Sequence, residues 1–212
     1  SVIPIFNVPL RNGDMKIFCD GSIEVKNVDG YTFNPTLLKG TKNYSEFGKH
    51  AVVVVYPKPI SFEVLGDDHQ TIYDQAHEIS KWGDNVWVKI PIMTTNGIDT
   101  YGVIRQLSKD GIKVNVTAIM TLEQIRAAAR MVLPNIPAIL SIFAGRIADT
   151  GRDPVPFFTE ASRVKHDKTE ILWASTREVY NYYQAQQCGA GIITMPPEMI
   201  KKLSLKDKDL TT

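Results

Sequence analysis

Short apolar runs recur along the chain, and polar or amphipathic segments separate most of them. Several runs are continuously apolar instead of alternating, as is typical of strands that a parallel sheet buries on both faces. We predict eight strands, over residues 16–20, 30–34, 60–65, 86–90, 113–119, 138–143, 170–175 and 191–195.

Four of the intervening segments have helical periodicity or helix end signals. Residues 67–82 carry an apolar stripe of Ile72, Ala76 and Ile79. Residues 96–111 carry a stripe of Ile98, Tyr101, Ile104 and Leu107, followed by a glycine stop at Gly111. Residues 121–132 open with Thr121 and Gln124 at capping-box spacing, and residues 176–191 have a glycine stop at Gly189.

Alternation of strands and helices up to eight strands predicts an α/β fold, a single-domain (β/α)8 TIM barrel. Its weakest part is residues 21–29, which leave room for only a short connection between the first two strands. An open doubly wound sheet is the alternative, but no glycine-rich phosphate fingerprint follows the first strand.

We assign the barrel domain, with a helical C-terminal tail, to residues 15–212. Residues 1–14 lack the basic and apolar parts of a signal peptide. Because a natural start could lie at Met15, we interpret residues 1–14 as an N-terminal extension or an artificial remnant.

Composition and charge narrow the class of protein. The 212 residues are 43% hydrophobic and 22% charged, as in an ordinary globular domain. A net charge of +1 implies no general attraction to nucleic acid or to acidic membranes, and no apolar run is long enough to span a membrane. Cys19 and Cys188 match no metal or redox spacing, which fits a cytoplasmic protein.

A lysine interrupts one of the most apolar predicted strands. Side chains alternate along a strand, so Trp87 and Lys89 share one face while Val86, Val88 and Ile90 share the other. The latter three suit the helix-covered outside of a barrel, and Lys89 is then expected to point inward. Burial disfavours the ammonium form of a lysine, and the neutral amine is a nucleophile that forms a Schiff base with carbonyl compounds.

The predicted C-terminal strand ends, where barrel enzymes have their active sites, are unusually polar. They carry Asp20, Asn34, Glu63, Lys89, Asn115, Thr117, Ser141 and Ser175. Position alone leaves open whether Lys89 is catalytic or forms a structural ion pair with Glu63 or Asp20. Two carboxylates at neighbouring strand ends favour catalysis, because imine chemistry requires proton transfers.

Eight motifs occur in order at the spacing of barrel strands: "KIFCDG", "GYTFNPTLL", "ISFEVL", "VWVKIPI", "VNVTAIMTLEQ", "SIFAGRIADTGRD", "ILWAST" and "GAGIITMPPEMI". From about Met15 to Leu203 the chain therefore resembles the small-subunit transaldolases and the fructose-6-phosphate aldolases of the class I aldolase superfamily. The resemblance implies sugar-phosphate substrates, no cofactor, no metal ion, and a homo-oligomer such as a ring-like decamer.

The resemblance also implies roles for individual residues. Lys89 matches the lysine that forms a Schiff base with the donor ketose. Asp20 matches the aspartate that accepts the proton of the donor C4 hydroxyl when the C3–C4 bond breaks. Glu63 matches a glutamate that acts through a bound water, which Thr117 would hold. The residues implied for the rest of the donor are Thr32, Asn34, Asn115 and Ser141, with Arg146, Ser175 and Arg177 as the phosphate clamp.

Two positions distinguish transaldolases from aldolases within this resemblance. The aldolases have glutamine in place of Glu63 and tyrosine in place of Phe143. Without a tyrosine hydroxyl to protonate it, the carbanionic intermediate survives to meet an aldehyde acceptor. The chain is therefore expected to transfer a dihydroxyacetone unit from fructose 6-phosphate or sedoheptulose 7-phosphate to an aldose phosphate, in pentose-phosphate metabolism or a specialised sugar pathway. An aldolase that uses free dihydroxyacetone and a silent sugar-phosphate-binding barrel are the alternatives.

The chain departs from the family pattern at three positions. Gly21 follows Asp20 where threonine or serine is common. Phe33 replaces the second threonine of a "T-T-N-P" segment, and strand alternation predicts that its side chain points outward. Pro154 stands where many relatives have glycine.

Overall fold

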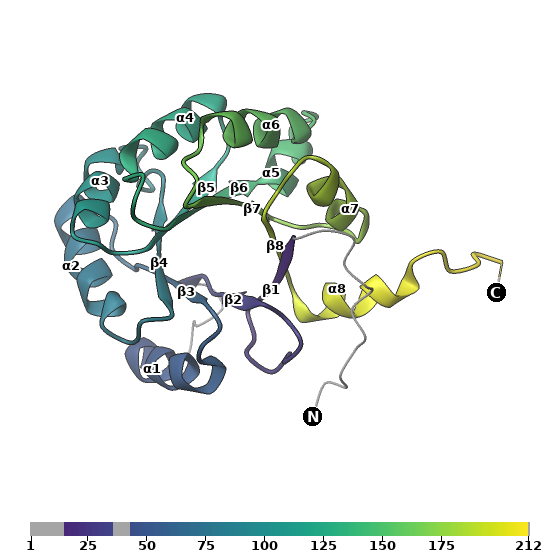
Figure 1. Cartoon of the computed structure of the whole chain (residues 1–212), viewed down its shortest axis with the longest axis horizontal. Helices are drawn as coiled ribbons and strands as arrows, with labels where there is room; N and C mark the ends of the chain where they lie inside the picture. The colour runs from purple at the N-terminus through teal and green to yellow at the C-terminus, as the bar shows by residue number, and fades with distance from the viewer. Residues whose placement is uncertain (1–14, 36–42, 212) are drawn as a thin grey trace.

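The computed structural model describes residues 15–35 and 43–211, and in it eight parallel strands close into a barrel (Figure 1). Each strand pairs with the next along the chain, and the last pairs with the first. The strands are β1 (Lys16–Asp20), β2 (Gly30–Thr32), β3 (Ile60–Glu63), β4 (Val86–Pro91), β5 (Val114–Ile119), β6 (Ala138–Phe143), β7 (Thr169–Ala174) and β8 (Ile192–Met195). The predicted (β/α)8 single-domain barrel is confirmed.

Helices surround the barrel from the second strand onward (Figure 1). They are α1 (Tyr44–Val55), α2 (His69–Ser80), α3 (Tyr101–Lys109), α4 (Leu122–Met131), α5 (Ala144–Asp149), α6 (Val155–Val164), α7 (Tyr180–Gln187) and α8 (Pro197–Lys202), followed by a 3-10 turn over Leu203–Leu205. No helix joins β1 to β2, in agreement with the short connection expected there. The interpretation of residues 1–14 lies outside the described residues.

The helix signals in the sequence correspond to real helix ends. Thr121 and Gln124 form a reciprocal capping box at the start of α4: the Thr121 hydroxyl accepts from the Gln124 N–H at 3.1 Å, and the Gln124 side chain accepts from the Thr121 N–H at 3.2 Å. Gly111 and Gly189 follow α3 and α7 with φ of +80° and +82°. This left-handed conformation favours glycine and stops both helices.

One predicted helix begins later than its apolar stripe suggested. Ile98 is 52% exposed and lies before α3, which starts at Tyr101. The Thr94 hydroxyl accepts a hydrogen bond from the Ile98 N–H at 3.1 Å, and the Thr94 N–H donates to the Ile98 carbonyl at 2.8 Å. This local turn uses the backbone groups that a longer helix would need, so the placement of Ile98 on a helical face was wrong.

Strand alternation separates an outer core from a smaller inner one. Val86, Val88 and Ile90 of β4 lie in the large apolar core between the barrel and its helices, whereas Trp87 packs in the inner cluster. Phe33 also faces outward, as predicted: its ring stacks on Phe62 with centroids 5.5 Å apart. The inner cluster consists of Phe18, Ile139, Leu172, Ala174 and Ile192, with Trp87 and Phe143 packed against it.

No helix within residues 15–35 and 43–211 combines the length and the apolar character that crossing a bilayer requires.

Candidate active site

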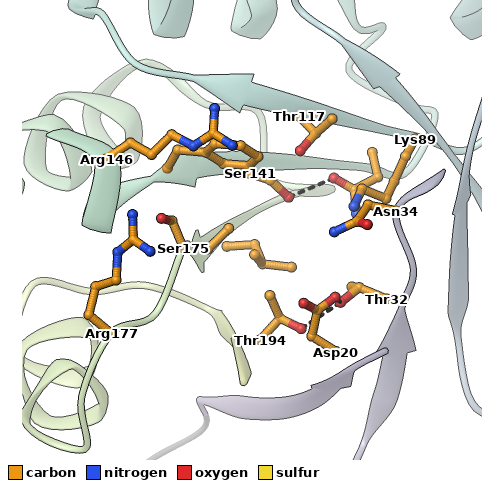
Figure 2. A pocket seen from close by; sticks show the side chains of 14 residues that line it. Asp20, Thr32, Asn34, Lys89, Thr117, Ser141, Arg146, Ser175, Arg177 and Thr194 are labelled. Carbon is orange, nitrogen blue, oxygen red and sulfur yellow. Dashed lines mark hydrogen bonds between the residues drawn. The ribbon is translucent and has the colours of Figure 1, made fainter. Parts of the chain in front are cut away.

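A cavity of about 220 Å³ lies at the C-terminal ends of the strands, and most of its wall is polar (Figure 2). Every candidate site residue predicted from the sequence lines it, with the exception of Glu63. The polar lining consists of Asp20, Thr32, Asn34, Lys89, Asn115, Thr117, Ser141, Arg146, Ser175, Arg177 and Thr194, and the apolar lining of Phe143, Leu172 and Ala174.

Lys89 projects into this cavity from the middle of β4 and is only 7% exposed. Its neighbour in register on β3 is Glu63. The Lys89 Nζ and Glu63 Oε1 atoms are 3.8 Å apart, close enough for charge attraction but too far for a hydrogen bond. The ion pair that position alone left open is therefore present, in a form that leaves the amine unbound by Glu63.

Glu63 lies beside the lysine but is not among the residues that line the cavity. Burial raises the pKa of its carboxyl above the ordinary value, and the nearby Lys89 charge offsets part of that rise. A raised pKa makes a carboxyl better suited to take up a proton and release it again.

Asp20 is the last residue of β1, and its side chain is the second carboxyl group of the site. Burial raises its pKa, while the charge of Lys89 and a hydrogen bond from Thr32 act in the lowering direction. The Thr32 hydroxyl donates to Asp20 Oδ1 at 2.8 Å. Gly21 follows with φ of +87°, and its N–H donates to the Thr32 carbonyl at 2.9 Å. The departure at Gly21 thus has a backbone reason, because this left-handed turn favours glycine.

The next strands contribute a chain of side-chain hydrogen bonds. Asn115 is in register with Lys89 on the adjacent strand β5. Its side chain accepts from the Ser141 hydroxyl at 2.7 Å and donates to the Ser61 hydroxyl at 3.2 Å. These bonds hold the Asn115 amide in one orientation beside the lysine. The Thr117 hydroxyl is buried, and within the described part of the chain it has no hydrogen-bond partner.

Two arginines lie on the opposite side of the cavity from Lys89 (Figure 2). Arg146 belongs to α5, and its guanidinium lies over the Phe143 ring, 5.2 Å from the centroid. Arg177 follows β7 and pairs with Asp149 at 2.8 Å. Arg177 therefore takes part in a surface salt bridge while its side chain also lines the cavity.

The loop that carries Ser175 and Arg177 is firmly anchored. Its backbone N–H groups at Arg177 and Glu178 donate to the Asn181 side chain at 2.9 and 3.1 Å. The Thr176 hydroxyl donates to the Thr194 carbonyl at 2.8 Å. Ser175 itself has φ of +58°, so its position depends on the surrounding contacts.

Gly145 permits α5 to approach this loop closely. A Cβ atom at Gly145 would lie 1.9 Å from the Ser175 carbonyl oxygen and 2.7 Å from Arg177 Nε. Only glycine fits here, and the two arginines can therefore share one side of the cavity.

Thr194 is the polar lining residue that sequence reasoning missed, and Leu172 and Ala174 are the apolar ones. It lies on β8, and its hydroxyl is 2.6 Å from that of Thr32. A signal was present: Thr194 follows Ile192 by two residues, the same inward spacing that separates Asp20 from Phe18. Pro154 lies outside the cavity lining and precedes α6.

The histidines have structural surroundings. His69 Nε2 is 2.7 Å from the Asp99 carbonyl oxygen, and His77 pairs with Asp110 at 2.9 Å. Within residues 15–35 and 43–211, no three or more His, Cys, Asp or Glu side chains are grouped so that they could hold a metal ion. For His50 and His166 the sequence likewise showed no ligand partner at suitable spacing.

The fold and the cavity together define a (β/α)8 protein with a buried lysine and two carboxyl groups at the C-terminal ends of its strands. A family model described as transaldolase/fructose-6-phosphate aldolase matches residues 19–211. The chain belongs to this family.

The relatives agree with this assignment. A protein of Nitrosopumilus maritimus is 32% identical over 201 residues, which cover 89% of this chain and 87% of that protein. A protein of Streptococcus pyogenes is 34% identical over 184 residues, which cover 85% and 82%. Both are named probable transaldolase, and these relationships support an aldolase or transaldolase enzyme.

Similar solved structures have far lower sequence identity. The crystal structure of KGPDC from Streptococcus mutans superimposes with a TM-score of 0.62 at 11% identity, covering 89% of this chain and 91% of that one. At this identity the likeness concerns the barrel fold alone.

Proposed function

We propose that the chain is a transaldolase that moves a dihydroxyacetone unit from a ketose phosphate to an aldose phosphate through a Schiff base on Lys89. The observation that carries the proposal is a buried lysine whose charge acts on two carboxyls with pKa values raised by burial, opposite a pair of arginines. Fructose 6-phosphate and sedoheptulose 7-phosphate are the expected donors.

The first step is attack of the neutral Lys89 amine on the ketose C2 carbonyl, which forms a C–N bond and then loses water to give an iminium ion. Glu63 is too far from Lys89 Nζ for direct proton transfer, so a bound water carries the proton of the adding amine to the C2 oxygen and then relays a proton from Glu63, and the C2 hydroxyl leaves as water. The Thr117 hydroxyl, buried in the cavity wall, is available to hold that water. Lys89 itself supplies the electron sink, so the reaction needs no cofactor.

The second step breaks the C3–C4 bond of the donor. Asp20 accepts the proton of the C4 hydroxyl, the electron pair of the broken bond moves into the iminium to give an enamine, and the aldose phosphate leaves. The raised pKa of Asp20 suits it to return this proton when the enamine attacks a new aldehyde. Asn34, Asn115 and Ser141 line the cavity and are assigned to the hydroxyl groups of the retained three-carbon unit.

The phosphate end of the substrate is assigned to the opposite side of the cavity. Arg146, Arg177 and the Ser175 hydroxyl line that side, and guanidinium groups bind phosphate oxygens in paired hydrogen bonds. Phosphate binding there places the other end of a six- or seven-carbon ketose toward Lys89.

Transfer is favoured over simple aldol cleavage by Phe143. This residue lies in the cavity wall under the Arg146 guanidinium and has no acidic hydrogen. The enamine therefore waits for an aldehyde acceptor instead of being protonated and released as free dihydroxyacetone. An aldolase that uses free dihydroxyacetone is the second candidate, and dependence on an acceptor distinguishes the two.

Borohydride trapping tests the proposal directly. The protein is incubated with fructose 6-phosphate, reduced, and examined by intact and peptide mass spectrometry. We expect a three-carbon adduct on Lys89 that is absent from the Lys89→Met variant. Turnover that requires added erythrose 4-phosphate then identifies a transferase.

The other outcomes are equally informative. A six-carbon adduct without cleavage shows that the imine forms and that the Asp20 step is blocked. Absence of an adduct with both fructose 6-phosphate and sedoheptulose 7-phosphate contradicts the proposal and favours a silent sugar-phosphate-binding barrel.

A further inference from the structure

Two threonine hydroxyls, one on each strand beside β1, form a chain of hydrogen bonds that ends at Asp20. The Thr32 hydroxyl on β2 lies 2.8 Å from Asp20 Oδ1, and the Thr194 hydroxyl on β8 lies 2.6 Å from that of Thr32. All three side chains line the same cavity (Figure 2). β2 and β8 flank β1 on opposite sides, so the aspartate is reached from both neighbouring strands.

Proton counting fixes the direction of this chain of hydrogen bonds when Asp20 is ionised. A hydroxyl carries one hydrogen, and the hydrogen of Thr32 is donated to the carboxylate. The short contact between the two threonines can then form only if Thr194 donates to Thr32. Both hydroxyl dipoles therefore point toward Asp20, and each strengthens the other.

The position of Thr194 is itself fixed by the backbone. It is in register with Phe18 of β1, and its carbonyl accepts from the Thr176 hydroxyl at 2.8 Å. Its side chain is 8% exposed, so little water competes for the hydroxyl.

We propose that Thr194 is a positioning residue of this enzyme: by donating to Thr32, it orients the Thr32 hydroxyl toward Asp20 and favours the ionised carboxylate that accepts the donor's C4 proton. The inference rests on the proposed function for its catalytic consequence. The relay, meaning the hydrogen bonds from Thr194 to Thr32 and from Thr32 to Asp20, can be tested without turnover.

Several influences besides the two threonines act on the ionisation of Asp20. Burial disfavours its ionised form, and Glu198 of α8 adds a repulsive charge, while Lys89 of β4 and the Thr32 hydrogen bond favour ionisation. Removing the Thr194 hydroxyl leaves Thr32 free to rotate away and weakens the last of these. The pKa of Asp20 should then rise.

The test uses the full chain and three substitutions. Thr194→Val removes the hydroxyl at constant shape, and Thr194→Ser restores it. Thr169→Val is the matched control, because Thr169 is a buried strand threonine of β7 whose hydroxyl has no hydrogen-bond partner within the described residues. It lines a separate cleft, with Met15 and Lys16.

Two measurements are made on each protein. The first is the titration of the Asp20 carboxyl carbon by NMR with ¹³C-labelled aspartate, assigned with Asp20→Asn. The second is kcat/KM against pH in the transfer of a dihydroxyacetone unit from fructose 6-phosphate to erythrose 4-phosphate.

We expect Thr194→Val to titrate Asp20 at higher pH and to lose about three- to tenfold in kcat/KM on the acid side, the effect of one hydrogen bond, with recovery as pH rises. Thr194→Ser and Thr169→Val should match the unmodified protein. Unchanged Asp20 titration in Thr194→Val, or an activity loss equal at every pH, overturns the inference. If the unmodified protein transfers nothing, the proposed function fails, and the NMR titration alone decides whether the relay exists.

Discussion

The two ends of the barrel interior differ sharply, although the same strands build both. On β1, β4, β6 and β8 an apolar inward residue is followed two positions later by a polar one. These pairs are Phe18 and Asp20, Trp87 and Lys89, Ile139 and Ser141, and Ile192 and Thr194. The apolar inward residues form a small plug, and the polar ones line a cavity of about 220 Å³ at the C-terminal strand ends, where Leu172, Ala174 and Phe143 of the plug complete the wall.

The difference shows how the fold keeps stability and chemistry apart. The apolar plug gains stability from its buried surface and holds the strands in register. The polar end contains buried charges and the Thr117 hydroxyl, which has no hydrogen-bond partner among residues 15–35 and 43–211, and burial alone makes both unfavourable. Because the two layers lie on the same strands, the plug fixes the position of each polar side chain.

The largest effect should come from the lysine of the polar layer. Lys89→Met removes the only group that can form the proposed imine, and kcat/KM should fall by a factor on the order of 10⁴ or more. The steady-state transfer rate measures this. The apolar layer is untouched, so the far-ultraviolet circular dichroism spectrum should be unchanged; activity within tenfold of the unmodified protein would contradict the assignment of Lys89.

The apolar layer should respond in the opposite way. Ile192 is fully buried in the plug, and Ile192→Ala should lower the free energy of unfolding by about 2–4 kcal/mol, from lost burial and the cavity left behind. Urea unfolding measures the loss. Below the unfolding transition the variant should still form the borohydride-trapped adduct; loss of trapping in folded protein would show that the layers are not separable in this way.

The close approach between α5 and the loop after β7 offers a more local test. Gly145→Ala should push the Ser175 carbonyl and the Arg177 side chain away, and KM for the phosphorylated donor should rise about tenfold. Trapping of unphosphorylated dihydroxyacetone should change little. Equal losses for both substrates would assign Gly145 to the stability of the fold instead of the phosphate clamp.

The acid limb of the activity profile should reflect the buried carboxylates. Asp20 must be ionised to accept a proton, and burial raises its pKa. Activity should therefore decrease as pH falls through a range above the ordinary carboxyl value of about 4. A profile of kcat/KM against pH measures this, and a limb at the ordinary value would show that Asp20 is not the group that limits the reaction.

The smallest effect concerns the carboxylate of Glu160, whose pKa is lowered, whereas that of Asp20 is raised. Arg163 and Arg126 hold the pKa of Glu160 at about 2, well below its usual range. A lowered pKa gives stability that is present above the ordinary pKa and is lost as pH falls toward 2. Glu160→Gln should therefore be slightly less stable at neutral pH, with the difference vanishing near pH 2 in thermal unfolding scans. A constant difference at all pH values would exclude the ion pairs as its cause.

Much of this protein could be predicted from the sequence, because strand and helix periods are local. Eight buried runs predicted the barrel, and alternation alone placed Lys89 inside and Val88 and Phe33 outside. The family motifs selected the candidate residues, eleven of which line one cavity. The wrong placement of Ile98 on a helical face shows the limit, since a hydrogen bond from the Ile98 N–H to the Thr94 hydroxyl overrode the apolar spacing.

Tertiary structure alone decided which of these residues meet and how. The 3.8 Å between Lys89 Nζ and Glu63 Oε1 depends on the register of β3 and β4 in the barrel. The Thr194 hydroxyl meets Thr32 across 162 positions of sequence, because closure of the barrel brings β8 beside β1. The sequence by itself determined the elements and the chemical groups, since these depend on neighbours a few residues apart. Distances, burial and the pKa values that follow depend on contacts between distant strands, which only the closed barrel creates.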